Sequence, residues 1–178
     1  MLRYRTATKE DTDSIAVLHA KNWKLNYRGI LNDQYLDHEV TEDRQKVWKA
    51  RLEHYNPNMY LILAEEAGEL VGFGCLFLED DERYGALLDN LHVGHLHSGK
   101  GIGGKLMALL AKEILRRAGR RDMYLWVLRD NIAAIRFYER LHAQRKEQHT
   151  ETELWEHPVE KIRYYWPTVA ILVSDRNS

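Results

Sequence analysis

Glycines and lysines are concentrated in one short stretch of the sequence, between an apolar segment and a segment with helical periodicity. They are Gly99, Lys100, Gly101, Gly103, Gly104 and Lys105. Glycine lets a backbone approach a ligand closely, and the first N–H groups of a helix have no intrahelical partner and attract anions. The stretch 98–104 is therefore predicted to bind a phosphate or pyrophosphate group.

The spacing of these glycines differs from that of the two common nucleotide-binding loops. Lys105 is followed by Leu106, so the hydroxyl that binds Mg²⁺ in a GxxxxGK[ST] loop is missing. Leu106 also stands where the dinucleotide fingerprint GxGxxG would place its third glycine. Taken alone, the stretch could also be a glycine-rich turn without a ligand.

A second motif begins at Asn131 and reads NIAAIRFYERL. Together the two motifs resemble the GNAT superfamily of acyl-CoA-dependent N-acetyltransferases. In that family a [QR]xxGxG loop holds the pyrophosphate of coenzyme A, and an NxxAxxFYxxxGF segment forms a second helix at the cofactor. This chain departs from the pattern at Ser98, at His142-Ala143, and at His95, where the family often has proline.

The resemblance covers nearly the whole chain and implies an α/β fold, with a mixed, mostly antiparallel sheet flanked by helices on both faces. It also implies a single domain over residues 1–178 and acetyl-CoA as the cofactor. The cofactor residues carried over are Leu91, His92, Val93, Ser98, Gly99, Lys100, Gly101, Ile102, Gly103, Gly104, Asn131, Ala134 and Tyr138. Leu91 and Val93 would contribute through their backbones, by pairing with the pantetheine arm.

Amide formation from a thioester requires an uncharged amine, a stabilised oxyanion and a proton for the leaving thiolate. The resemblance places Tyr138 near the cofactor sulfur, where a phenol can donate to a thiolate; the alternative is a core aromatic residue. The N–H of Val93 is a candidate oxyanion donor. For the general base we place Asp89 narrowly ahead of His92, and a structural role for either is equally open.

The acceptor amine is expected to meet aromatic side chains, because the loop between the first two helices forms one wall of the acceptor site in the family. Trp23, Tyr27 and the segment up to Tyr35 are the candidates there. Trp126, Trp155 and the run 164–166 are candidates for the other wall. Each of these aromatic residues could instead serve packing.

Two other kinds of chemistry are disfavoured by the sequence. His92, His95 and His97 match no standard metal-ligand spacing, so no metal site is predicted. Cys75 lies in an apolar segment without an evident base, which favours direct transfer over a covalent thiol intermediate.

Composition and charge further narrow the class of protein to which the chain can belong. The chain has 178 residues, a formal charge of −1 and one cysteine, which indicates a globular protein without an intramolecular disulfide. Near-zero charge argues against a nucleic-acid partner. No apolar run approaches membrane-spanning length and the N-terminus lacks a signal-peptide pattern, so a cytoplasmic protein is expected. The aromatic-rich C-terminal part would suit a homodimer interface.

Periodicity and turn signals predict alternating helices and strands. The predicted helices are 11–26, opened by a Thr8–Asp11 capping box, then 32–37, 41–54, 104–118 and 131–141. The predicted strands are 2–5, 59–65, 70–78, 87–93, 123–128, 144–150 and 162–173.

These observations favour an N-acetyltransferase that moves the acetyl group of acetyl-CoA directly to a primary amine of a small molecule or peptide. The alternative is a catalytically degenerate module that binds acyl-CoA as a sensor or contacts a partner. The departures at Ser98 and His142 keep that alternative open.

Overall fold

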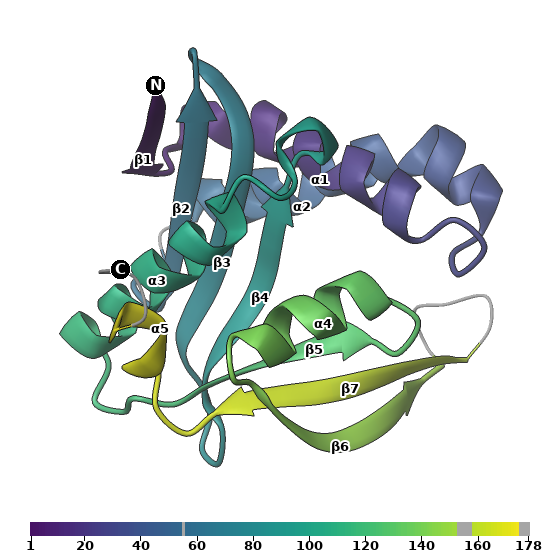
Figure 1. Ribbon diagram of the computed structural model, residues 1–178. Coiled ribbons are helices and arrows are strands. Elements are labelled where there is room, and N and C mark those ends of the chain that lie inside the picture. The colour runs from purple at the N-terminus through teal and green to yellow at the C-terminus, as the bar shows by residue number, and fades with distance from the viewer. Residues whose placement is uncertain (55, 153–157, 175–178) are drawn as a thin grey trace. The chain divides into compact units, whose positions relative to one another are not determined.

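The computed structural model describes residues 1–54, 56–152 and 158–174. The elements in chain order are β1 (Leu2–Thr6), η1 (Lys9–Asp11), α1 (Thr12–Asn26), η2 (Tyr35–Glu39), α2 (Val40–Glu53), β2 (Met59–Glu66), β3 (Glu69–Asp81), β4 (Gly85–Val93), η3 (His95–His97), α3 (Ile102–Arg117), β5 (Met123–Leu128), α4 (Ile132–Arg140), β6 (Gln144–Glu151), β7 (Val159–Trp166) and α5 (Ile171–Ser174) (Figure 1). Trp155, a predicted acceptor residue, lies outside the described residues.

The strands form one mixed sheet in the order β1-β2-β3-β4-β5-β7-β6. The pairs β1–β2, β5–β7 and β6–β7 are antiparallel, whereas β4 and β5 are parallel and pair at Ala86–Met123 and Leu87–Tyr124. The predicted α/β class with a mixed, mostly antiparallel sheet is confirmed.

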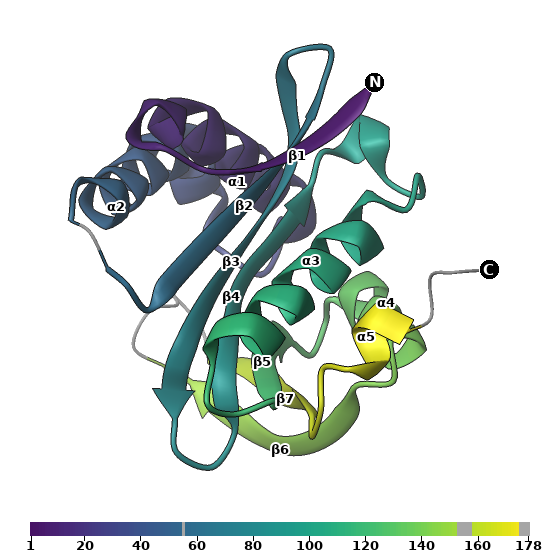
Figure 2. The ribbon, with the colours of Figure 1, turned by 90° about the vertical axis from the view of Figure 1, so that its left-hand side faces the viewer.

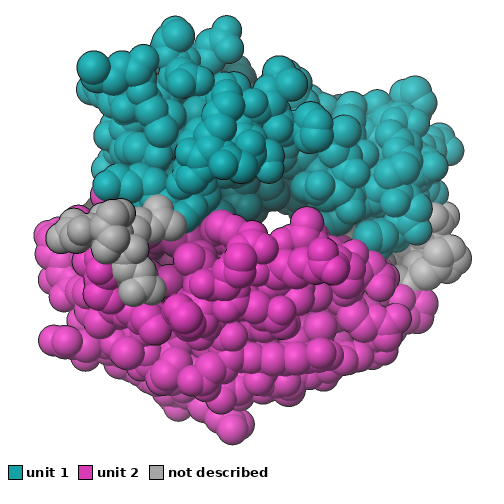
Figure 3. All heavy atoms as spheres, viewed as in Figure 1, with its two compact units in different colours: residues 1–75, 90–106 teal, residues 76–89, 107–178 magenta. Residues whose placement is uncertain are grey.

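The chain divides into two compact units, and β3, β4 and α3 each contribute to both (Figure 3). Unit 1 comprises residues 1–75 and 90–106, and unit 2 comprises residues 76–89 and 107–178. The expectation of a single domain over residues 1–178 stays a prediction.

In unit 1, helices cover both faces of β2 and β3 (Figure 2). On one face, α1 and α2 bury a core with strand residues Leu63, Phe73 and Cys75. On the other face, the first turn of α3 lies against Gly72, where an added Cβ would lie 3.3 Å from Ile102 Cγ2. Because side chains alternate along a strand, residue 73 faces α1 and α2 whereas its neighbour, residue 72, faces the first turn of α3.

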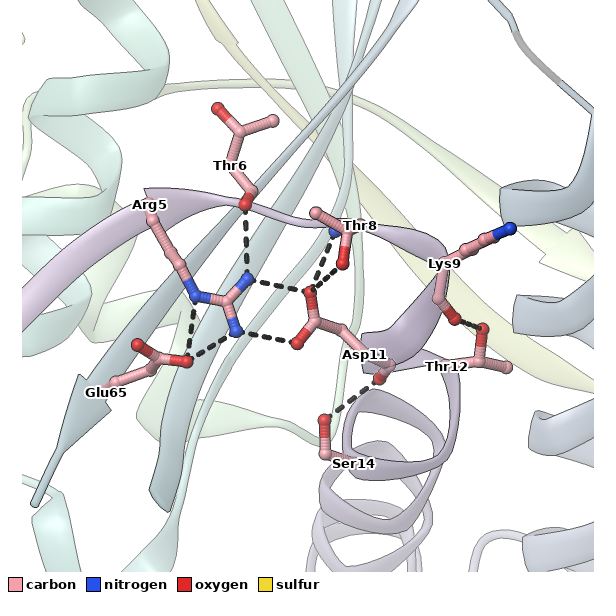
Figure 4. Close-up of polar contacts among 8 residues, drawn as sticks. All are labelled: Arg5, Thr6, Thr8, Lys9, Asp11, Thr12, Ser14 and Glu65. Atoms are coloured by element: carbon pink, nitrogen blue, oxygen red, sulfur yellow. Dashed lines mark hydrogen bonds and ion pairs between the residues drawn. The ribbon is translucent and has the colours of Figure 1, made fainter. Parts of the chain in front are cut away.

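The predicted Thr8–Asp11 capping box is present, and it caps the 3₁₀ turn η1, which leads directly into α1 (Figure 4). The Thr8 backbone N–H donates to Asp11 Oδ2 at 2.8 Å, and the Asp11 N–H donates to the Thr8 carbonyl at 3.1 Å. These bonds satisfy N–H groups that a helix start leaves without partners.

Two predicted elements need correction. The helices predicted at 32–37 and 41–54 are joined without a break, because the π-helical turn η2 runs directly into α2. The strand predicted at 162–173 is wrong in its second half, since β7 ends at Trp166 and α5 follows. Pro167 comes directly after Trp166, and proline cannot donate to a strand ladder.

Among the described residues, none of the helices combines the length and the apolar character needed to span a bilayer.

Candidate functional site

The predicted phosphate-binding stretch forms a loop that leads from η3 into α3. Gly99 and Gly101 adopt positive φ angles of +77° and +79°, and a Cβ at either position would meet no atom within 4 Å. Residues 98–101 are exposed, and the Lys105 N–H donates to the Gly101 carbonyl at 3.0 Å in the first turn of α3. The glycines of the loop therefore leave open space directly before the first turn of α3, as close approach of a phosphate requires.

The segment that leads into the loop is held by β2 and β3. The Gly94 N–H donates to the Val71 carbonyl at 2.8 Å, and His97 Nε2 lies 3.2 Å from Glu66 Oε2. Lys100 and Lys105 are exposed and carry positive charge to the same stretch. The geometry suits an anionic ligand with a close backbone contact.

In unit 2, Asn131 and Tyr138 lie on one short helix, α4. Asn131 caps the helix, since its Oδ1 accepts from the Ala134 N–H at 3.2 Å, as predicted. Tyr138 is buried and packs edge-to-face on Trp166, with ring centroids 6.1 Å apart. Its side chain is thus held by the core of unit 2.

The end of α4 uses a non-glycine residue in the left-handed region. His142 has φ +62°, its N–H donates to the Glu139 carbonyl at 2.9 Å, and the Ala143 N–H donates to the Tyr138 carbonyl at 3.1 Å. This pair of bonds is a Schellman motif. The departure at His142-Ala143 therefore preserves the helix-ending turn that glycine usually makes.

On β4, Asp89, Leu91, His92 and Val93 are all partly buried. The His92 ring faces α1, where Asn22 Nδ2 lies 3.4 Å from His92 Nδ1 and 3.1 Å from the Val93 carbonyl oxygen. Burial, and secondarily the positive charge of Arg44, lower the pKa of His92 to about 4. At neutral pH His92 is therefore uncharged.

The predicted aromatic wall of the acceptor site lies at the C-terminal end of α1. The rings of Trp23 and Tyr27 are 5.4 Å apart, and the Arg44 guanidinium lies 4.4 Å from the centre of the Trp23 ring. Asp43 accepts from the Tyr35 hydroxyl at 2.5 Å and from Arg44 Nη2 at 2.6 Å. The Arg44 guanidinium thus covers a face of the Trp23 indole.

Trp126, the predicted acceptor residue of unit 2, also packs against an internal cation. The Arg163 guanidinium lies 4.5 Å from the Trp126 ring, 4.8 Å from Tyr124 and 4.0 Å from Tyr84. Arg163 also forms an ion pair with Glu147 at 3.2 Å. Cross-strand pairing of Trp126 with Arg163 explains the contact.

Asn22, His19, Arg44 and Asp43 adjoin the predicted site residues but were missed from the sequence. The sequence gives little indication that these four residues belong to a site, because each lies on a helix with one solvent-facing side, where polar residues are common. A histidine and an asparagine on the apolar side of α1, at positions 19 and 22, were the available clue.

Within residues 1–54, 56–152 and 158–174 no group of three or more His, Cys, Asp or Glu is arranged to hold a metal. Cys75 is fully buried in the core of unit 1. Reactive thiols need access and a cationic neighbour, so a buried core thiol does not fit a nucleophile.

A cavity of about 390 Å³ lies in unit 2 around the turn from β3 to β4. Its lining residues are Leu78, Glu79, Asp80, Asp81, Glu82, Gly85, Ala118, Gly119 and Arg120. None of the predicted site residues is among them, so the cavity is separate from the motifs.

Comparison with known proteins decides the family. Residues 25–143 match the model of the acetyltransferase (GNAT) family, which is well over half of the chain. The chain belongs to the GNAT acetyltransferase family. Members of this family are acyl-CoA-dependent acetyltransferases, so the predicted enzyme class and acetyl-CoA cofactor are confirmed.

Relatives of this GNAT chain are N-acetyltransferases by name. An uncharacterized N-acetyltransferase of Bacillus subtilis, YuaI, is 27% identical over 141 residues, covering 78% of each chain. A spermine/spermidine N(1)-acetyltransferase of the same organism is 32% identical over 78 residues, covering 41% of this chain and 51% of the relative. The PaiA N-acetyltransferase of Thermoplasma acidophilum, solved with coenzyme A, has a similar fold, with a TM-score of 0.70, 20% identity and coverage of 93% and 99%.

Proposed function

We propose that this GNAT protein transfers the acetyl group of acetyl-CoA directly to a primary amine of a small molecule or peptide. The observation that supports it most is the glycine loop at the start of α3, where two positive-φ glycines face open space. Side chains at these positions would project into that space, so the glycines fit close approach of a pyrophosphate.

The cofactor would be held by three groups of residues in this proposal. The pyrophosphate is bound by the loop residues Ser98, Gly99, Lys100, Gly101, Ile102, Gly103 and Gly104. On β4 the cofactor is bound by Leu91, His92 and Val93, and on α4 it is bound by Asn131, Ala134 and Tyr138. Exposed Lys100 and Lys105 supply positive charge for the phosphates. When bound, acetyl-CoA supplies the activated acetyl thioester.

The chain's own groups then move protons and stabilise charge. Asp89 accepts the proton of the acceptor ammonium through a carboxylate oxygen, which frees the nitrogen lone pair for attack on the thioester carbonyl. The Val93 N–H donates to the oxygen that becomes negatively charged. The Tyr138 hydroxyl would donate its proton to the leaving sulfur, and the phenolate so formed would take the second proton of the attacking nitrogen, which leaves one proton on Asp89. One acetyl group is moved, and no redox partner is needed.

Trp23, Tyr27 and Trp126 are proposed to contact the acceptor. Polyamines enter as one acceptor class, because a relative that matches part of the chain is a spermine/spermidine acetyltransferase. Amino acids, peptides and other compact amines are the second class.

The deciding experiment is isothermal titration of the purified protein with acetyl-CoA and with CoA. The wild type is compared with Gly101→Glu, which places a side chain and a negative charge in the loop. Gly68→Glu is the matched control, because Gly68 also has a positive φ (+86°) and open space but lies in the turn from β2 to β3.

Binding by the wild type and by Gly68→Glu, with loss of binding in Gly101→Glu, supports the proposed cofactor site. Absence of binding in the wild type would overturn the proposal. Binding without acetylation of any amine in a broad panel would favour the degenerate acyl-CoA-binding module instead.

A further inference from the structure

Two histidines of unit 1 pack against each other with tilted rings, although they lie far apart in the sequence. His19 on α1 and His92 on β4 have ring centroids 4.4 Å apart and ring planes inclined by 38°. Phe73 lies 5.8 Å from His19 and 5.1 Å from His92. His19 is 2% exposed, whereas His92 keeps a partly exposed surface.

The hydrogen-bond partner of His19 fixes the position of its proton. The Trp48 indole N–H, which can only donate, lies 3.0 Å from His19 Nδ1. Nδ1 is therefore an acceptor, and neutral His19 carries its proton on Nε2. That Nε2–H is buried and has no partner among the described residues.

The proton of His92 is placed by a similar argument. The Asn22 amide nitrogen must face the Val93 carbonyl oxygen, at 3.1 Å, because a carbonyl only accepts. The same nitrogen lies 3.4 Å from His92 Nδ1, so Nδ1 accepts and neutral His92 carries its proton on Nε2. The lone pair on His92 Nδ1 is thus occupied, and the Nε2–H is the group that can donate to a ligand.

Both imidazoles are held in the neutral form. Burial lowers the pKa of His19, with smaller contributions from His92, Arg44 and Arg51, and burial followed by Arg44 lowers the pKa of His92. At neutral pH both rings are therefore uncharged, and because each Nδ1 faces a donor, each ring carries its N–H on Nε2.

The surroundings of the pair disfavour a second ammonium group in the acceptor. The Trp23 face that could hold such a cation is covered by the Arg44 guanidinium at 4.4 Å. An oxygen atom suits this environment better, because it accepts an N–H.

We propose that His92 is a specificity-determining residue that donates its Nε2–H to a carboxylate or carbonyl oxygen of the acceptor. Resting on the function proposed above, the acceptor class is then an α-amino acid derivative or the amino terminus of a peptide, and a polyamine is excluded. His19 acts as a positioning residue: it stacks beneath the His92 ring and is itself fixed by Trp48.

The test compares acceptors that differ only by the oxygen-bearing group. Leucinamide and leucine carry a carbonyl and a carboxylate next to the amine, and 3-methylbutylamine is the same skeleton without either. The kcat/KM ratio of each oxygen-bearing acceptor to 3-methylbutylamine is measured for the wild type, His92→Phe, His92→Gln and the control His54→Phe, an exposed histidine at the end of α2. Intrinsic differences in amine reactivity cancel when ratios are compared between variants.

We expect the ratio to fall about tenfold in His92→Phe, as for loss of one hydrogen bond, mainly through KM of the oxygen-bearing acceptor. His92→Gln, which keeps an N–H donor, should recover part of the ratio, and His54→Phe should leave it unchanged. Leucine and leucinamide together show whether the carboxylate or the neutral carbonyl is recognised. An unchanged ratio in His92→Phe, or a wild-type preference for spermidine, would overturn the proposal.

Two-bond ¹H–¹⁵N NMR of the imidazoles provides a readout that does not depend on turnover. The proton of His92 is expected on Nε2 in the wild type, and finding it on Nδ1 would overturn the proposal. If the protein binds acetyl-CoA but acetylates no amine, the proposed function fails and the role of His92 in acceptor choice fails with it, whereas the position of the His92 proton is still tested by this spectrum.

Discussion

Arg5 on β1 and Asp11 at the start of α1 form a two-point ion pair, with Nη1–Oδ2 and Nη2–Oδ1 distances of 2.7 and 2.6 Å (Figure 4). Arg5 Nε also donates to Glu65 on β2 at 2.9 Å. The guanidinium therefore joins two strands to the first helix of unit 1. Because Asp11 is buried, this pair is screened less than an ordinary surface ion pair.

Asp11→Asn is expected to destabilise the protein by about 1–2 kcal/mol, since it removes charge-assisted bonds to Arg5 and weakens the cap of η1, the turn that leads into α1. Urea unfolding followed by circular dichroism measures the change. Asp13→Asn, at an exposed carboxylate in the first turn of α1, is the matched control and should change stability by only a few tenths of a kcal/mol. Equal effects of the two substitutions would contradict the role given to Asp11.

The same carboxylate should make stability depend on acidity. The hydrogen bonds from Arg5 hold the pKa of Asp11 at about 2, below the value of about 4 expected in the unfolded chain. A lowered native pKa stabilises the folded state fully above the unfolded pKa, and the contribution is lost as the pH falls towards 2. The stability difference between wild type and Asp11→Asn should therefore shrink between about pH 4 and 2. A difference that stays constant over this range would contradict the assignment.

His142→Gly is expected to stabilise the protein by up to about 1 kcal/mol. The left-handed conformation at φ +62° strains a residue with a Cβ, and glycine adopts it freely. His142→Ala keeps the Cβ and should give no such gain. Thermal unfolding of the three proteins separates relief of strain from loss of the imidazole, and a gain in both variants would assign the effect to the side chain.

Gly85→Ala should be clearly destabilising, by about 1–3 kcal/mol. Gly85 has φ +78°, and its added Cβ would lie 2.7 Å from the Asp122 carbonyl oxygen. Gly119→Ala is the control, because Gly119 has no atom within 4 Å of an added Cβ and no positive φ. If both variants unfold at the same urea concentration as the wild type, the close approach of Gly85 to Asp122 is not maintained in solution.

Tyr138→Phe tests the proposed acid. We expect kcat to fall by about 100-fold or more, with the affinity for CoA within a few-fold of wild type, because the ring proposed to contact the cofactor stays and only the hydroxyl proposed to act on the leaving sulfur is removed. Tyr60→Phe, at a partly buried tyrosine on β2, controls for loss of a hydroxyl. A variant that keeps its kcat would show that Tyr138 serves packing only.

Local patterns predicted most elements because their signals lie within a few residues of each other. β5 begins and ends at the predicted residues Met123 and Leu128, and the Thr8–Asp11 cap was evident from residue type and spacing. The loop between Ser98 and Gly104 could be placed for the same reason. β7 was extended too far because the apolar residues after Pro167 resemble a strand, although they enter the short helix α5.

Contacts between distant segments could not be predicted in this way. His19, Trp48 and His92 come from α1, α2 and β4, and only the folded chain brings their rings together. Likewise, the stacking of Arg163 on Trp126 depends on the register of β5 with β7. Sequence periodicity gives the face on which a residue lies but not the residue opposite it.

Gly72 has a further consequence for the phosphate-binding loop. An added Cβ would lie 3.0 Å from the His92 carbonyl oxygen, 3.3 Å from Ile102 and 3.4 Å from Leu106. Those residues belong to the strand before the loop and to the helix turn after it. A single methyl group added at Gly72 on β3 would thus push apart the two segments that flank the loop. The first turn of α3 can pack this closely on the sheet because residue 72 has no side chain.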